Sequence, residues 1–138
     1  MTGEQKEHRF RRRTVRIAFV LYAAALTLGT HWPELSAPSA GPDHLDKFVH
    51  FVAFAIGTLL LGLTGWLGSI EALRTAVFAL SIGVAWSVAD ELTQGLPGLG
   101  RTVSGLDLVA NLTGVAAASL TLVLIGLRAS RVRSPETF

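Results

Sequence analysis

Four long apolar stretches, separated by short polar segments, dominate the pattern of hydrophobic and polar positions along the chain. Three of them carry no Lys, Arg, Asp or Glu, and they cover residues 17–33, 48–70 and 108–127. The remaining stretch starts at residue 75, and its helical pattern continues to residue 94. A helix needs roughly 20 residues to cross the hydrocarbon core of a bilayer. None of the stretches has a polar stripe at helical spacing over its middle. The pattern therefore predicts an all-α, polytopic membrane protein, a bundle of four transmembrane helices.

Composition points the same way and excludes several other classes of protein. Half of the 138 residues are hydrophobic, 16% are charged, and the mean hydropathy is +0.48. Soluble domains carry about 25% charged residues, so this composition argues against an ordinary water-soluble enzyme. No basic stripe with interleaved aromatic residues is present, so we expect no nucleic-acid partner. Cysteine is absent, which rules out disulfides, thiolate metal sites and a cysteine nucleophile.

The distribution of basic residues predicts the orientation, because loops rich in Lys and Arg stay in the cytoplasm. Ten basic residues fall on one side of the predicted bundle: Lys6, Arg9, Arg11, Arg12, Arg13, Arg16, Arg74, Arg128, Arg131 and Arg133. The other side has only Lys47 and Arg101. We therefore expect a basic cytoplasmic segment at 1–15, a transmembrane domain at 16–127 and a basic cytoplasmic tail at 128–138. An alternative is a cleavable signal peptide ending near the small residues 37–40.

The ionisable and amide side chains near the membrane all lie toward the predicted outer side. They are Asp46, Lys47 and His50, then Asp90, Glu91 and Gln94, and finally Arg101, Asp107 and Asn111. A rise of 1.5 Å per residue places His50, Glu91 and Asn111 at similar depth. Asp46 and His50 share a helical face, as do Asp107 and Asn111, because each pair is spaced i, i+4. Since charged groups facing lipid are costly, the sequence predicts a polar cluster between the last three helices, open to the outside.

These residues resemble the blocks that characterise the VanZ-like family of small bacterial membrane proteins. The matching strings are DKFVHF at 46–51, ADELTQ at 89–94 and RTVSGLDLVANLTG at 101–114. They occur in the family's order, and the resemblance covers about residues 15–127. It implies a multi-pass protein of the bacterial cytoplasmic membrane and an association with glycopeptide antibiotic resistance. The loop at 96–100 differs from the short segment that precedes the arginine in the family. This difference affects which position Arg101 takes in the predicted site.

The residue types in this cluster suggest both chemistry and binding. A carboxylate can orient a histidine and raise its basicity, so His50, Glu91 and Asp107 are candidate catalytic residues. Asp46, Lys47, Asp90, Gln94, Arg101 and Asn111 are candidate binding residues. The catalytic trio could instead bind Mg²⁺, Mn²⁺ or Ca²⁺, although no dedicated metal motif is present, and the sequence does not identify a cofactor. A purely structural alternative pairs Lys47 with Asp90 or Glu91, and Arg101 with Asp107.

Three functions follow from these observations. The first is an outward-facing protein that binds an envelope lipid, a lipid-linked wall precursor or a glycopeptide-type antibiotic. The second is a membrane enzyme that acts on a lipid headgroup through His50, Glu91 and Asp107. The third is a proton-coupled transporter, which fits least because the inner halves of the helices carry no ionisable residue to continue a path.

Overall fold

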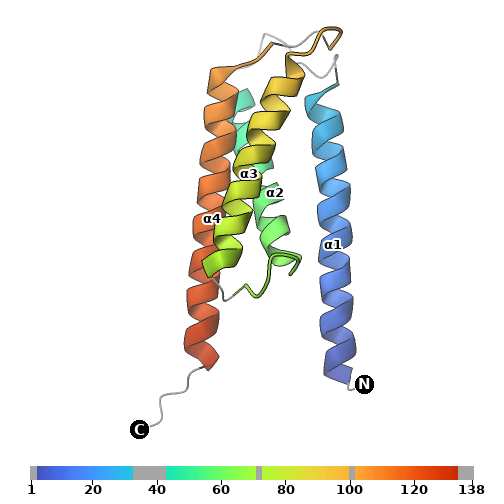
Figure 1. Cartoon of the computed structure of the whole chain (residues 1–138), viewed down its shortest axis with the longest axis vertical. Coiled ribbons are helices and arrows are strands. Elements are labelled where there is room, and N and C mark those ends of the chain that lie inside the picture. Colours follow the sequence, from blue (N-terminus) through green and yellow to red (C-terminus); the bar gives the residue numbers. More distant parts are fainter. Residues whose placement is uncertain (1–2, 33–42, 71–72, 100–101, 134–138) are drawn as a thin grey trace.

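The computed structural model describes residues 3–32, 43–70, 73–99 and 102–133, and these residues form an all-helical molecule. Four α-helices run roughly alongside one another in Figure 1: α1 (Gly3–Thr30), α2 (Asp43–Leu63), α3 (Leu73–Gln94) and α4 (Gly105–Arg133). The predicted all-α class with four long helices is confirmed. In Figure 1, α1 begins and α4 ends at the same end of the molecule, beyond the turn that joins α2 to α3.

Three of the four helices are long and apolar enough to cross a membrane. Their spans are Leu45–Leu63, Leu73–Gln94 and Gly105–Val132. The first helix falls short of this test because its first half carries the arginine cluster. Its uncharged part, residues 17–30, covers only about 21 Å, against a hydrocarbon core of about 30 Å. A multi-pass membrane protein is therefore supported, whereas a crossing by α1 and the cytoplasmic location of both termini remain predictions.

The second helix ends at Leu63, not at residue 70 as the apolar run predicted. Thr64 donates its hydroxyl to the Leu61 carbonyl, 2.7 Å away, and its amide bonds back to Leu60 and Leu61. Gly65 and Gly68 follow with φ of +72° and +122°, in the left-handed region where glycine carries no steric penalty. An apolar run alone does not reveal this turn, because its residues stay hydrophobic after the helix has stopped.

Helices α2 and α4 pack most closely, through small residues. A Cβ added at Gly114 would collide with the carbonyl oxygen of Phe51 and lie 3.1 Å from the amide nitrogen of Ala55. Gly83 of α3 likewise fits against Val115 of α4. Close backbone approach at small residues is the usual way in which helices associate in membranes. It brings the N-terminal ends of α2 and α4 near enough for their polar side chains to meet.

Helix α1 attaches to this core through a few specific contacts. The Tyr22 hydroxyl donates to the carbonyl of Ala53 at 2.8 Å. Phe19 and Phe54 both contact the Trp86 ring, with centroid separations of 6.4 and 5.6 Å. Helix α1 thus rests on α2 and α3 at its middle, and its contact with α3 is slight.

Candidate functional site

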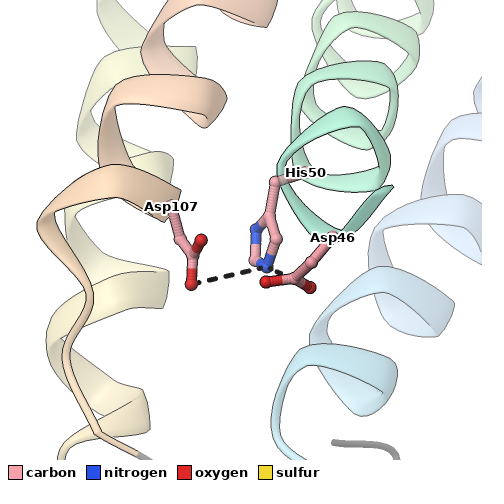
Figure 2. A group of neighbouring side chains, drawn as sticks. All are labelled: Asp46, His50 and Asp107. Atoms are coloured by element: carbon pink, nitrogen blue, oxygen red, sulfur yellow. Dashed lines mark ion pairs between the residues drawn. The ribbon is translucent and has the colours of Figure 1, made fainter. Parts of the chain in front are cut away.

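The first polar cluster joins α2 to α4, and we call it the α2–α4 cluster. Its members are Asp46, Lys47 and His50 on α2 with Asp107 and Asn111 on α4. The Lys47 ammonium lies 2.9 Å from Asp46 Oδ2 and 2.7 Å from Asp107 Oδ1. Figure 2 shows His50 between the two carboxylates. The structural alternative that paired Lys47 with Asp90 or Glu91 is wrong, because Lys47 reaches across to α4 instead of α3.

The environment of His50 is asymmetric. Its Nδ1 lies 3.0 Å from Oδ1 of Asn111, which is fully buried. Its Nε2 faces Asp46 Oδ1 at 3.8 Å and Asp107 Oδ2 at 4.0 Å. Those two separations exceed hydrogen-bonding distance. Because Oδ1 of Asn111 can only accept a hydrogen bond, Nδ1 of His50 is the donor. Nε2 is then the ring nitrogen that can exchange a proton or contact a ligand.

The same cluster holds the atoms that a metal ion would need. Asp46, His50 and Asp107 offer one ligand atom each, all within 4.8 Å of one another. This set has Asp46 where the sequence suggested Glu91. However, the Lys47 ammonium already lies between the two carboxylates. A divalent ion would have to displace it, so the arrangement favours an internal ion pair over a dedicated metal site.

A second polar cluster joins α1 to α3, and we call it the α1–α3 cluster. The Thr30 hydroxyl donates to Asp90 Oδ1 at 2.7 Å, and Gln94 Nε2 donates to Asp90 Oδ2 at 2.9 Å. His31 Nε2 lies 2.8 Å from Thr93 Oγ1. Sequence reasoning placed Asp90 and Gln94 among the binding residues but missed Thr30, His31 and Thr93. Two adjacent polar residues at the end of the first apolar stretch were the signal that could have revealed Thr30 and His31.

Glu91 points neither to His50 nor to Lys47. Its Oε1 accepts the backbone N–H of Ser104. Ser104 in turn caps α4, because its hydroxyl accepts the amide of Asp107 at 3.3 Å and satisfies one of the free N–H groups at a helix start. The buried Glu91 carboxylate therefore anchors the approach to α4 and helps to place Asp107.

Not all of the predicted site residues come together. His50, Asp107 and Asn111 are in contact, whereas Glu91 has no hydrogen bond or ion pair with them within the described ranges. Arg101 and its suggested pairing with Asp107 lie outside the described residues. Three buried polar atoms of these residues, Glu91 Oε2, Asp107 Oδ1 and Asn111 Nδ2, have no hydrogen-bond partner among the described residues, although Asp107 Oδ1 forms the ion pair with Lys47 at 2.7 Å.

A groove between α1 and α2 runs past the α2–α4 cluster. It has a volume of about 260 Å³ and is lined by Ala25, Leu26, Gly29 and Thr30 of α1 and by Asp46, Val49, His50 and Ala53 of α2. Three of these lining residues are polar members of the two clusters, and the other five are apolar or glycine. The groove therefore offers hydrogen-bonding groups beside an apolar wall.

The arrangement can bind a polar group and exchange a proton at His50, beside the partly exposed ion pair of Lys47 and Asp107. Its parts come from α1, α2 and α4, with α3 supplying the buried supports Asp90 and Glu91.

A comparison with protein-family models, curated proteins and solved structures gives no match to this chain.

Proposed function

We propose that this chain is a multi-pass protein of the bacterial cytoplasmic membrane that binds an envelope lipid or a lipid-linked wall precursor in the groove between α1 and α2. The single observation that carries the proposal is that Asp46 and His50 line both the polar cluster and an otherwise largely apolar groove. A ligand that fits such a groove is amphiphilic, because one part of it must hydrogen-bond while the adjoining part stays apolar. The basic asymmetry of the sequence, which predicts that this end faces outward, supports an envelope ligand.

The volume of the groove favours a lipid over a glycopeptide antibiotic. Small-molecule sites usually occupy roughly 300–1,000 Å³, so about 260 Å³ accommodates a headgroup and the adjoining part of a chain. A glycopeptide antibiotic is much larger than this volume, so most of it would lie outside the groove. The remainder of a lipid chain would follow the outer surface of α2, where Val49 and Phe48 are more than half exposed.

The charges narrow the chemistry of the headgroup. The Lys47 ammonium already contacts two carboxylates, those of Asp46 and Asp107. The groups that remain on the groove wall are a carboxylate, a histidine nitrogen and a threonine hydroxyl, which favour amine, hydroxyl or amide groups over a bare phosphate. A lipid that carries such groups next to its chain satisfies the site. The resemblance to VanZ-like proteins lies in the same residues and supports the same envelope role.

The proposal is tested by filling the groove without touching its charges. Ala53→Leu places a larger apolar side chain on the groove wall, and Ala85→Leu makes the same change at an exposed position of α3. Each variant and the wild type are purified from bacterial membranes, incubated with a total bacterial envelope lipid extract and analysed by native mass spectrometry. We expect the wild type and Ala85→Leu to retain the same lipid, and Ala53→Leu to retain at least tenfold less. Equal retention by all three proteins would contradict the proposal.

An enzyme acting on the same lipid is the second candidate function. It is favoured by the single observation that Nε2 of His50 faces two carboxylates at about 4 Å, an arrangement suited to general acid–base catalysis. The lipid experiment separates the two functions, because only an enzyme changes the mass of the lipid. A new lipid mass that disappears in His50→Gln would establish catalysis, whereas an unchanged mass supports binding.

A further inference from the structure

The opposite end of the molecule contains a basic pocket that the proposed function does not use. It has a volume of about 290 Å³ and lies between the first half of α1 and the turn that follows α2. His8, Arg11 and Arg12 line it from α1, and Gly65 and Gly68 line it from the turn. Leu63 and Ile70 add an apolar edge. We propose that this pocket binds the phosphate of an anionic phospholipid in the leaflet on this side of the membrane.

The arginines of the pocket are available for a ligand. Arg11 and Arg12 are exposed, and neither has an ion pair or hydrogen bond to any residue that the structure describes. They are on adjacent positions of α1, and His8 lies on the same face because it is spaced i, i+3 and i, i+4 from them. Guanidinium groups bind phosphate oxygens through paired N–H donors and keep their charge at every physiological pH. Two guanidiniums and an imidazole therefore line the pocket with groups that can bind an anion.

Guanidinium groups lie beside both glycines of the turn, and at Gly68 the approach is too close for a side chain to fit without a shift. A Cβ at Gly65 would lie 3.8 Å from the Arg12 guanidinium, and a Cβ at Gly68 would lie 3.2 Å from Nη2 of Arg74. Both glycines have positive φ values, 72° and 122°, which L side chains rarely adopt. Any other residue at Gly68 would both strain the turn and displace Arg74. The turn thus gathers positive charge from α1 and from the start of α3 around one short segment.

Hydrogen bonds hold this turn in place before any ligand arrives. The buried Thr75 hydroxyl donates to the Ser69 carbonyl at 2.7 Å, and Arg16 Nε donates to the Thr64 carbonyl at 3.0 Å. The Arg16 guanidinium also lies 5.7 Å from the centre of the Trp66 ring, within the range of a cation–π contact. Because the turn is already fixed from both sides, binding does not have to order it, which lowers the entropic cost.

The position of the pocket favours a lipid phosphate over a soluble one. The pocket lies immediately past the end of the Leu45–Leu63 span, where headgroups are found. Trp66 is half exposed beside it, as is typical of aromatic residues at the membrane interface. Basic pockets between helices on the cytoplasmic side are known to bind anionic headgroups. The apolar edge from Leu63 and Ile70 provides a surface for the start of an acyl chain.

The test compares two double variants that remove the same charge from the same helix. Arg11→Gln with Arg12→Gln changes the pocket, whereas Arg9→Gln with Arg13→Gln changes exposed arginines outside it. The full-length proteins in detergent micelles are titrated with phosphatidylglycerol or phosphatidylcholine and the bound lipid is counted by native mass spectrometry. We expect the wild type and the Arg9/Arg13 variant to retain phosphatidylglycerol over phosphatidylcholine. The Arg11/Arg12 variant should bind phosphatidylglycerol about tenfold more weakly.

Two outcomes would overturn the proposal. If both double variants bind phosphatidylglycerol equally weakly, the net charge of the helix, and not the pocket, attracts the lipid. In a parallel arm, inorganic phosphate is added as a competitor. If it displaces phosphatidylglycerol at the concentration of the lipid itself, the ligand is a soluble phosphate and the lipid assignment is wrong. Displacement only at far higher concentration supports a lipid. These outcomes are independent of the groove between α1 and α2, because none of the altered residues lines it.

Discussion

Nδ1 of His50 lies 3.0 Å from Oδ1 of Asn111, and this contact links α2 to α4 beneath the ion pairs of Lys47. The asparagine is fully buried and the histidine nearly so. The contact does two things at once: it joins the two most closely packed helices, and it directs Nε2 of His50 toward Asp46, Asp107 and the groove.

Loss of this contact is expected to destabilise the bundle. Hydrogen bonds between membrane helices average about 0.6 kcal/mol, but Asn111→Leu also leaves a buried ring nitrogen without a partner, which raises the expected cost to about 1–2 kcal/mol. The measurement is the free energy of unfolding in mixed detergent–SDS micelles. The control is Thr113→Val, whose hydroxyl bonds only to Val109 of its own helix on an exposed face. A loss for Asn111→Leu no larger than for this control would contradict the role of the contact.

Gly114→Ala should weaken the packing of α2 on α4. The added methyl would meet backbone atoms of Phe51 and Ala55, which cannot rotate away as a side chain can. Overpacking of this kind costs about 1–3 kcal/mol. Gly29→Ala is the matched control, because nothing lies within 4 Å of its added methyl, and it should be neutral or stabilising by up to about 1 kcal/mol. Unfolding titrations measure the free energy of unfolding of both variants. Equal changes in the two variants would show that α2 and α4 can move apart at Gly114 without cost.

Glu91 provides a test that separates support from catalysis. Glu91→Gln keeps an oxygen that can accept the Ser104 amide, so this variant should fold like the wild type. Glu91→Leu removes that acceptor and should cost about 1–3 kcal/mol. If Glu91 only supports α4, lipid binding survives in Glu91→Gln and falls in Glu91→Leu together with stability. A folded Glu91→Gln protein that has lost its lipid would instead assign the carboxylate itself to the ligand site.

The ion pairs of Lys47 should be stronger than those on a protein surface. Lys47 is about one-third exposed and Asp107 about one-eighth exposed. The loss of folding stability in Lys47→Met should therefore be larger than the roughly 1 kcal/mol measured for exposed ion pairs and smaller than the roughly 3 kcal/mol for buried ones. Adding Asp107→Asn to Lys47→Met should recover part of that loss, since a carboxylate no longer stands unpaired. Thermal unfolding of the two variants and the wild type measures this coupling. A double variant less stable than Lys47→Met would contradict it.

Topology can be tested with single cysteines, because the chain has none of its own. If α1 crosses the membrane, an impermeant thiol reagent should label Ser39→Cys and Gly98→Cys in intact cells and spare Gly3→Cys and Ser134→Cys. Labelling of Gly3→Cys together with Ser39→Cys would leave only the three spans with sufficient apolar length. Labelling of Ser134→Cys would reverse the predicted orientation.

The helices themselves could be predicted because uninterrupted apolar stretches of this length have few other solutions. The neighbourhood of His50, Asp107 and Asn111 agrees with the prediction from spacing, because i, i+4 pairs at equal depth can face one another when their two helices pack together. The end of α2 could not be predicted, because the stop depends on the Thr64 hydroxyl and on two positive-φ glycines within an apolar run.

The partners of single side chains were the least predictable part of the site. Glu91 and Asp107 had compatible depths, but Glu91 accepts the amide of Ser104, just before α4, and spacing along the chain does not predict this partner. Thr30 and His31 were missed because they sit at the end of an apolar stretch, where their hydrogen bonds to α3 depend on the tilt of α1. Such contacts depend on helix rotation, which hydrophobic pattern alone does not determine.

Lipid photo-cross-linking at Val49 tests the central claim most directly. Val49 lines the groove and is 56% exposed, whereas Val109 of α4 is 59% exposed and does not line the groove. A photoreactive benzoyl-phenylalanine is placed at one or the other position in living bacteria, and the cross-linked lipids are identified by mass spectrometry. A groove that binds one lipid predicts a single dominant adduct at Val49 and the mixture of bulk lipids at Val109. The same mixture at both positions would show that the groove holds no particular lipid and would contradict the account.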